Sequence, residues 1–122
     1  QIAQGADVIF QAAGASGLGV LEAAAAQKIL GIGVDTDQSY AVPEAQRQYV
    51  LTSILKGIDT AVYDVIKLRK EDKVTGGYME LGVKNGVENY AQNDLNQALL
   101  APIKPRLDEI KGKIGSGEIQ VP

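Results

Sequence analysis

Residues 6–19 read ADVIFQAAGASGLG, and residues 29–35 read ILGIGVD. The first stretch opens with a short apolar run over residues 7–13, which Gly14 ends. Apolar side chains at helical spacing follow, and Ser16 is a residue type that caps helices. Residues 29–34 form a second apolar run with two glycines, a pattern typical of a strand buried on both faces. The order of strand, turn, helix and strand predicts a βαβ unit.

A βαβ unit places ligand sites at the carboxyl ends of its strands. Residues 10–19 and 35–38 both lie at that edge of the predicted unit. Asp35 follows the second strand, about 20 residues after the glycine turn, where dinucleotide-binding folds carry an acid that accepts ribose hydroxyls. A carboxylate suits a vicinal diol because its two oxygens can accept both O–H groups. The alternative is a loop carboxylate that caps a neighbouring backbone group.

The glycines run in the order Gly14-x-x-Gly17-x-Gly19, which does not meet the dinucleotide fingerprint Gly-x-Gly-x-x-Gly. Such a turn either lets the backbone approach a ligand at the start of a helix or packs tightly under that helix. Phe10, the only phenylalanine, is either a core side chain or a ring that stacks on a flat ligand. A metal site at Asp35 and Asp37 would need more oxygen ligands than this loop offers.

The remaining chain predicts further elements around this unit. Residues 57–70 carry apolar and charged side chains on opposite faces, typical of an amphipathic helix, and Pro105 suits the first turn of a helix that carries Leu107 and Ile110. The expected elements are a strand over 49–54, a helix over 57–70, a weak strand over 78–83, irregular structure or a hairpin over 84–96, a helix ended by 115–117, and an extended tail over 117–122.

The composition is 45% hydrophobic and 22% charged, with a net charge of −3. No dense Lys/Arg cluster is present, so nucleic acid is not an expected partner. Cysteine and histidine are absent, which excludes disulfides, thiolate metal sites and histidine-dependent catalysis. The composition therefore favours binding over catalysis, and we expect no enzyme activity, no cofactor and no metal.

The first five residues resemble the last turn of a helix, with Gly5 in the left-handed position that follows one. No start signal for that helix precedes them. We therefore expect these 122 residues to be a piece of a longer protein.

Five blocks of sequence together resemble the carboxy-terminal part of the basic membrane protein family. These are bacterial lipoproteins that serve as solute-binding components of ABC transporters, and the family includes purine-nucleoside receptors. The blocks occur in order at residues 5–14 (GADVIFQAAG), 31–38 (GIGVDTDQ), 50–56 (VLTSILK), 61–66 (AVYDVI) and 117–122 (GEIQVP).

The resemblance implies an α/β fold of the type I periplasmic-binding-protein kind, with a parallel sheet flanked by helices and two lobes that close on a ligand. Residues 1–49 and about 77–122 would belong to the second lobe, and residues from about 50 to 76 would form a hinge crossing and a first-lobe helix. The implied partners are a purine nucleoside or similar solute, the transporter permease and an amino-terminal lobe outside these residues. The implied location is the cell surface or periplasm, lipid-anchored through that missing part.

The resemblance also implies roles for individual residues. Phe10 matches an aromatic that stacks on the purine, and Asp35 matches the acid that holds the ribose hydroxyls. Lys56 matches a lysine near the ribose and the hinge, Gly14 a glycine of the cleft turn, and Gln38 lies in the family's Asp-x-Asp-Gln block.

The glycine turn departs from the family pattern, which tends to read Ala-Gly-Gly-x-Gly-Asn-Gly. The second glycine is Ala15, and the asparagine is Leu18, which removes an amide that could hydrogen-bond. The leading hypothesis is a nucleoside-binding protein of an ABC importer. The alternatives are a fragment of a Rossmann-type oxidoreductase and the sensor domain of a regulator. Orphaned sheet edges on an isolated fragment also favour pairing of its unfilled surfaces with a second copy.

Overall fold

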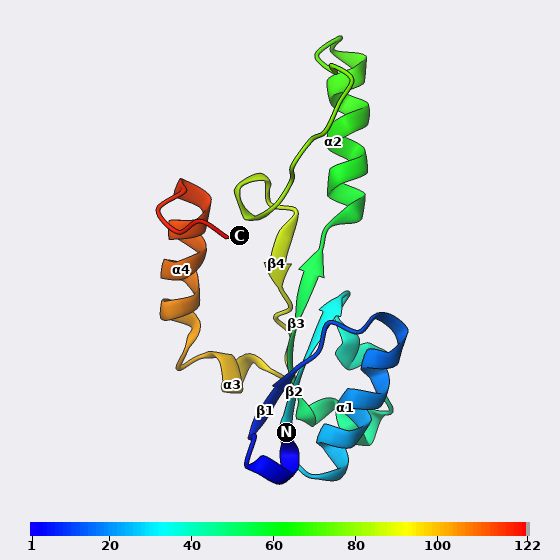
Figure 1. Cartoon of the computed structure of the whole chain (residues 1–122), viewed down its shortest axis with the longest axis vertical. Helices are drawn as coiled ribbons and strands as arrows, with labels where there is room; N and C mark the ends of the chain where they lie inside the picture. Colours follow the sequence, from blue (N-terminus) through cyan, green and yellow to red (C-terminus); the bar gives the residue numbers. More distant parts are fainter. Residues whose placement is uncertain (122) are drawn as a thin grey trace.

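The computed structural model describes residues 1–121 and contains the predicted βαβ unit, which lies at the end of the molecule opposite α2 (Figure 1). Strand β1 covers Val8–Phe10, helix α1 Gly17–Ala26 and strand β2 Leu30–Asp35. The two strands run parallel, with Val8 opposite Leu30 and Phe10 opposite Ile32. Strand β1 is shorter than predicted because the chain turns away after Gln11, whose side chain accepts the backbone N–H of Ala13 at 2.9 Å.

Four strands form one sheet in the order β1-β2-β3-β4. Strand β3, Val50–Lys56, runs parallel to β2, and strand β4, Glu88–Tyr90, runs antiparallel to β3. The prediction for 84–96 missed β4, because this strand is polar and is held by backbone pairing that hydropathy does not reveal. The strand predicted over 78–83 was wrong: that segment is irregular, and a 3₁₀ helix over Val83–Asn85 follows.

Helix α1 packs on one face of the sheet through small residues. Leu21 of α1 is buried with Val42 and Val50, and it reaches the backbone of Gly31, which offers no side chain to block it. The opposite face of β2 carries Ile32 and Val34, which are only half-buried. The prediction that this strand is buried on both faces was therefore wrong for the described residues, since only one of its faces lies under α1.

Helix α2, Ile58–Lys70, confirms the predicted amphipathic helix but buries none of its residues. It continues from the end of β3 and extends away from the sheet, and the chain then returns to β4 (Figure 1). The segment that leaves β3 and the segment that enters β4 are joined by a hydrogen bond, in which the backbone N–H of Gly57 donates to the carbonyl of Val87 at 2.6 Å. Exposed Ile58, Val62 and Ile66 leave an apolar stripe on α2 without cover in the described part of the chain.

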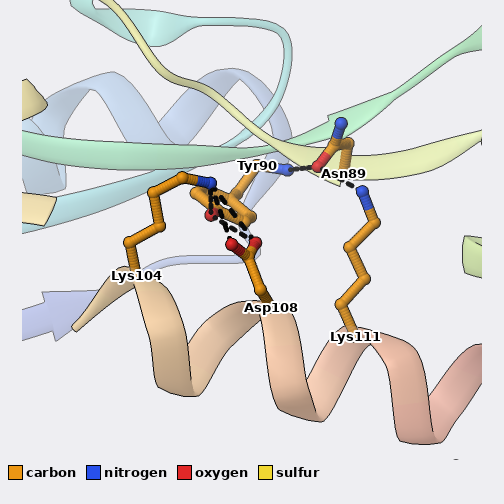
Figure 2. A network of polar contacts seen from close by, with 5 residues as sticks. All are labelled: Asn89, Tyr90, Lys104, Asp108 and Lys111. Atoms are coloured by element: carbon orange, nitrogen blue, oxygen red, sulfur yellow. Dashed lines mark hydrogen bonds and ion pairs between the residues drawn. The ribbon is translucent and has the colours of Figure 1, made fainter. Parts of the chain in front are cut away.

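Helix α4, Lys104–Ser116, follows the short helix α3, Gln97–Leu100, and lies beside β4. Polar contacts join it to that strand (Figure 2): the Tyr90 hydroxyl donates to Asp108 at 3.3 Å, and Lys111 Nζ donates to Asn89 at 3.1 Å. Lys104 Nζ also lies 3.1 Å from Asp108 Oδ2. None of the helices within residues 1–121 combines the length and apolar character that crossing a membrane requires.

The helix ends follow the predictions in part. Gly5 has φ 89° after a 3₁₀ turn over Ile2–Gln4, which confirms its predicted left-handed conformation. Helix α4 ends at Ser116, within the predicted range 115–117, and Gly117 follows it with a left-handed φ of 81° that was not predicted. Pro105 lies in the first turn of α4, as expected. Ser16 occupies the cap position of α1, but its side chain caps nothing, because its own backbone is already helical in the 3₁₀ turn that precedes α1.

The predicted tail bends back, with Ile119 N–H donating to the Lys113 carbonyl at 3.1 Å, and Pro122 lies outside the described residues.

We expect Gly31→Ala to destabilise the fold by about 1–3 kcal/mol, because a methyl group there would lie 2.6 Å from Cδ2 of Leu21. Gly19→Ala is the matched control, since Gly19 is a helical residue with no atom near its missing Cβ. That control should raise stability by roughly 0.5–1 kcal/mol. Urea denaturation of both variants measures the difference, and equal midpoints would contradict the tight contact between α1 and β2.

Candidate ligand-binding site

A concave surface of about 400 Å³ lies at the carboxyl ends of β1, β2 and β3. Four of the five residues predicted to bind ligand meet there, and the fifth, Gln38, does not line it. The lining residues are Phe10, Ala12, Gly14, Val34, Asp35, Ile54 and Lys56.

Strand alternation explains most of this set. Parallel neighbours in register share a face, and Val34 pairs with Ile54, so alternate residues of adjacent strands meet on one side of the sheet. Ala12, Val34 and Ile54 were not predicted as lining residues, although a projection of the three strands onto that face would have found them. Their side chains make the floor of the surface apolar.

Asp35 lies on this surface because its backbone leaves the strand conformation. Its φ is +71°, a left-handed value that side-chain-bearing residues seldom adopt. The N–H of Thr36 donates to the carbonyl of Val34 at 2.9 Å and closes a three-residue turn around Asp35. Strict alternation would send the Asp35 and Val34 side chains to opposite faces, whereas this turn brings both to one surface. Backbone strain of this kind concentrates at functional sites.

Lys56, the last residue of β3, faces Asp35. Its Nζ lies 2.9 Å from Asp35 Oδ1, and the two side chains are 58% and 49% exposed. The hydrogen bond and the charge of Asp35 raise the pKa of Lys56 above its ordinary value, and Glu88 contributes in the same direction. An exposed ion pair of this kind contributes little to the stability of a fold. Its main consequence here is that a carboxylate and an ammonium group lie side by side on the concave surface.

Phe10 and Gly14 form the side of the surface nearest β1. Phe10 is 57% exposed, so it is not a core residue in this structure. Gly14 has φ +54° and begins a 3₁₀ turn over Gly14–Ser16, which leads into α1. An exposed ring beside a backbone turn can stack on a flat ligand.

Gln38 points away from this surface and into the protein. Its Oε1 accepts the side-chain N–H of Gln11 at 2.8 Å and the backbone N–H of Val34 at 3.2 Å. Gln11 is 4% exposed and was not singled out from the sequence. Its partner lies 27 residues away, and only the fold brings the two amides together.

Asp37 also points inward. Its carboxylate accepts the N–H and hydroxyl of Ser39 and the amide of Asn93, the last at 2.8 Å. It thus ties the loop after β2 to the segment that leads into α3. No three His, Cys, Asp or Glu side chains within residues 1–121 lie close enough together to hold a metal ion.

The two departures in the glycine turn lie outside the concave surface. Leu18 packs beside the buried cluster of Leu21, Val42 and Val50, and Ala15 is exposed without lining the surface. The asparagine expected from the family pattern is therefore replaced by a side chain that contributes to the core.

The site as a whole offers an apolar floor, one exposed ring, and a carboxylate paired with an ammonium group. It suits a small, flat molecule that carries hydroxyl groups, because the ring can stack while the charged pair accepts and donates hydrogen bonds. The whole chain, residues 1–122, matches the family model described as "ABC transporter substrate-binding protein PnrA-like". The chain belongs to this family.

Members of this family with curated descriptions are similar along most of the chain. Basic membrane protein D of Borreliella burgdorferi (strain JD1) is 38% identical over 125 residues, which cover 97% of this chain and 35% of that protein. The ABC transporter nucleoside-binding protein BmpA of Lactococcus lactis subsp. cremoris is 34% identical over 125 residues, covering 90% of this chain and 36% of that protein. The chain thus spans about a third of the length of these relatives.

Solved structures agree with the family assignment. An ABC transporter solute-binding protein from Aeropyrum pernix K1 matches with a TM-score of 0.69 and 26% identity, over 98% of this chain and 41% of that chain. A second solute-binding protein, from Conexibacter woesei, matches at a TM-score of 0.68 and 19% identity and supports the fold alone. The predicted fold class, an α/β fold of the solute-binding kind with a mostly parallel sheet, is confirmed. The family match does not favour the oxidoreductase or regulator alternatives.

Asp35→Gly should be more stable than Asp35→Ala by about 1 kcal/mol. Both variants lose the carboxylate, but only alanine places a Cβ in a left-handed backbone, which costs roughly 1–2 kcal/mol. This cost exceeds the stability that alanine gains over glycine by restricting the unfolded chain. Urea denaturation of the two variants measures this difference. A more stable alanine variant would show that the turn around Asp35 is not strained.

Asp35→Asn should lower the pKa of Lys56 towards 10.5, its ordinary value, because the carboxylate that favours the ammonium form is gone. The folded pKa lies above the unfolded one, so the stabilisation from this pair is complete below the unfolded value and is lost as pH rises through the folded value. NMR titration of the Lys56 side chain measures this pKa in the unaltered protein and in the variant. An unchanged pKa in the variant would contradict the ion pair.

Proposed function

We propose that this chain forms one wall of an interlobe cleft in the solute-binding component of an ABC importer, and that the cleft binds a purine nucleoside. The observation that carries the proposal is the turn at Asp35, which brings its carboxylate to the same concave surface as the exposed ring of Phe10. The base would stack on Phe10 while the ribose hydroxyls donate to Asp35. The nucleoside-binding description of the Lactococcus relative supports this choice of ligand class.

Lys56 would complete the sugar site. Its ammonium already contacts Asp35, so it can hold the carboxylate in place and donate to a ribose oxygen from the same position. Gly14 would let the ligand approach the backbone of the turn, because glycine adds no side chain at that point. No bond is made or broken in this role, and we therefore propose a binding protein without catalytic activity.

The path of the chain supports a division between two lobes. The chain leaves the sheet after Lys56, forms α2, and returns at Glu88, and the two crossings are joined between Gly57 and Val87. We propose that residues from about 50 to 76 include a hinge crossing and a first-lobe helix, while residues 1–49 and about 77–122 belong to the second lobe. The apolar stripe on α2 would then pack against a first lobe contributed by residues outside this sequence, or against a second copy where that lobe is lacking.

The remaining partners follow from the proposed role. A substrate-binding component of an importer delivers its ligand to a permease, so we propose the transporter permease as a protein partner. We further propose an extracytoplasmic location with a lipid anchor outside these residues. One relative, from Pyrococcus furiosus, is described as a lipoprotein and is 34% identical over 93 residues, which fits this location.

The full-length protein should bind ribonucleosides more tightly than their 2′-deoxy analogues by roughly 1–3 kcal/mol, or about 5- to 150-fold in Kd. The reason is that Asp35 loses a hydrogen-bond donor when the 2′-hydroxyl is missing. Asp35→Asn should weaken ribonucleoside binding and shrink this difference, as isothermal titration calorimetry can measure.

The matched control is Asp7→Asn, which makes the same change of charge at an exposed residue that precedes β1, at the opposite end of the strand from the site. It should leave both affinities unchanged. Equal affinity of the unaltered protein for ribo- and deoxyribonucleosides would overturn the role of Asp35 in the proposed site.

A further inference from the structure

We propose that the hydrogen-bonded side chains of Gln11 and Gln38, here called the amide pair, position the two sides of the ligand site relative to each other. Neither residue lines the concave surface. Each is hydrogen-bonded to a segment that contributes lining residues to that surface. The amide pair would therefore act through these segments, without contact to the ligand. This inference rests on the proposed ligand site.

The first half of the amide pair holds the turn after β1. Gln11 Oε1 accepts the backbone N–H of Ala13 at 2.9 Å, and Ala13 lies between the lining residues Ala12 and Gly14. The Gln11 amide also lies against Gly17 at the start of α1, where a Cβ would collide with it. Phe10, which precedes Gln11, is thereby placed on the same anchored segment.

The second half holds the turn around Asp35. Gln38 Oε1 accepts the backbone N–H of Val34 at 3.2 Å, and Val34 is the first residue of the three-residue turn that carries Asp35. The backbone N–H of Gln38 donates to Ser53 Oγ at 3.0 Å, and Ser53 is fully buried in β3. Gln38 therefore joins the strained turn to the strand that carries Lys56.

The direction of the hydrogen bond between the two amides is determined by these backbone donors. Ala13 N–H requires an oxygen on Gln11, so Nε2 of Gln11 must be the group that faces Gln38. Val34 N–H likewise requires an oxygen on Gln38, and that oxygen accepts from both Val34 and Gln11. The amide pair thus needs a donor at position 11 and an acceptor at position 38.

This direction makes the two isosteric exchanges unequal. Gln38→Glu keeps an oxygen that accepts both N–H groups, so the positions of the turns should be retained. Gln11→Glu replaces the donor by a carboxylate oxygen that faces Gln38 Oε1, and rotation of Gln38 to meet it would take the acceptor away from Val34. Gln38→Met keeps the size of the side chain and removes both hydrogen bonds.

The test uses the full-length protein and a purine ribonucleoside as the calorimetric probe. Gln38→Met and Gln11→Glu should each raise Kd roughly tenfold, with unchanged stoichiometry, and should reduce the preference for ribo- over deoxyribonucleoside. Gln38→Glu should stay within about threefold of the unaltered protein. Gln48→Glu, which adds the same charge at an exposed glutamine, is the control and should leave Kd unchanged.

A second pair of variants reaches the amide pair without changing either glutamine. Gly17→Ala should push the Gln11 amide aside and raise Kd in the same way, whereas Gly19→Ala has no atom near its added methyl group and should not. Unchanged stoichiometry in each titration separates a loss of positioning from a loss of folded protein.

A readout without ligand keeps this inference distinct from the proposed function. If the amide pair positions Asp35 against Lys56, NMR titration of the ligand-free protein should show a lower pKa of Lys56 in Gln38→Met than in the unaltered protein or in Gln38→Glu. Failure of the unaltered protein to bind any nucleoside would overturn the proposed function. The titration would still test, without ligand, whether the amide pair positions Asp35 against Lys56. The inference is overturned if Gln38→Met leaves the pKa of Lys56 unchanged, or if Gln38→Glu raises Kd as much as Gln38→Met.

Discussion

A buried amide must find hydrogen-bond partners, and the arrangement of the site depends on where Gln11 finds them. Its side chain is almost fully enclosed, and leaving one of its polar groups without a partner would cost on the order of 1–3 kcal/mol. The oxygen accepts from the turn after β1, and the nitrogen donates to Gln38 in the loop after β2. Two loops that could otherwise move independently are therefore joined through one side chain.

The loop after β2 divides its polar residues between inward and outward roles. Asp35 faces the concave surface, whereas Asp37 and Gln38 point into the protein and hold the loop from two directions. A left-handed aspartate persists only where the surrounding structure over-determines its conformation. The contacts of Asp37 with Asn93 and of Gln38 with Val34 supply that support on the carboxyl and amino sides of the turn.

The parts of the fold that hydropathy and glycine spacing encode could be predicted from the sequence, including the βαβ unit and the helices α2 and α4. Phe10, Gly14 and Asp35 could be placed near one another because parallel strands end at the same edge of a sheet. Lys56 was assigned to the same site only through the family resemblance. Gln11 and Asp37 could not be assigned partners, since their contacts join residues 27 and 56 positions apart. Strand β4 was not predicted because its pairing uses backbone groups and its side chains are polar.

The two outermost strands of the described sheet, β1 and β4, are each three residues long. Short edges offer few unpaired backbone donors and acceptors, and so they are poor templates for the addition of a strand from another molecule. Association of this chain with itself would therefore have to use side-chain surfaces in preference to a continuous intermolecular sheet.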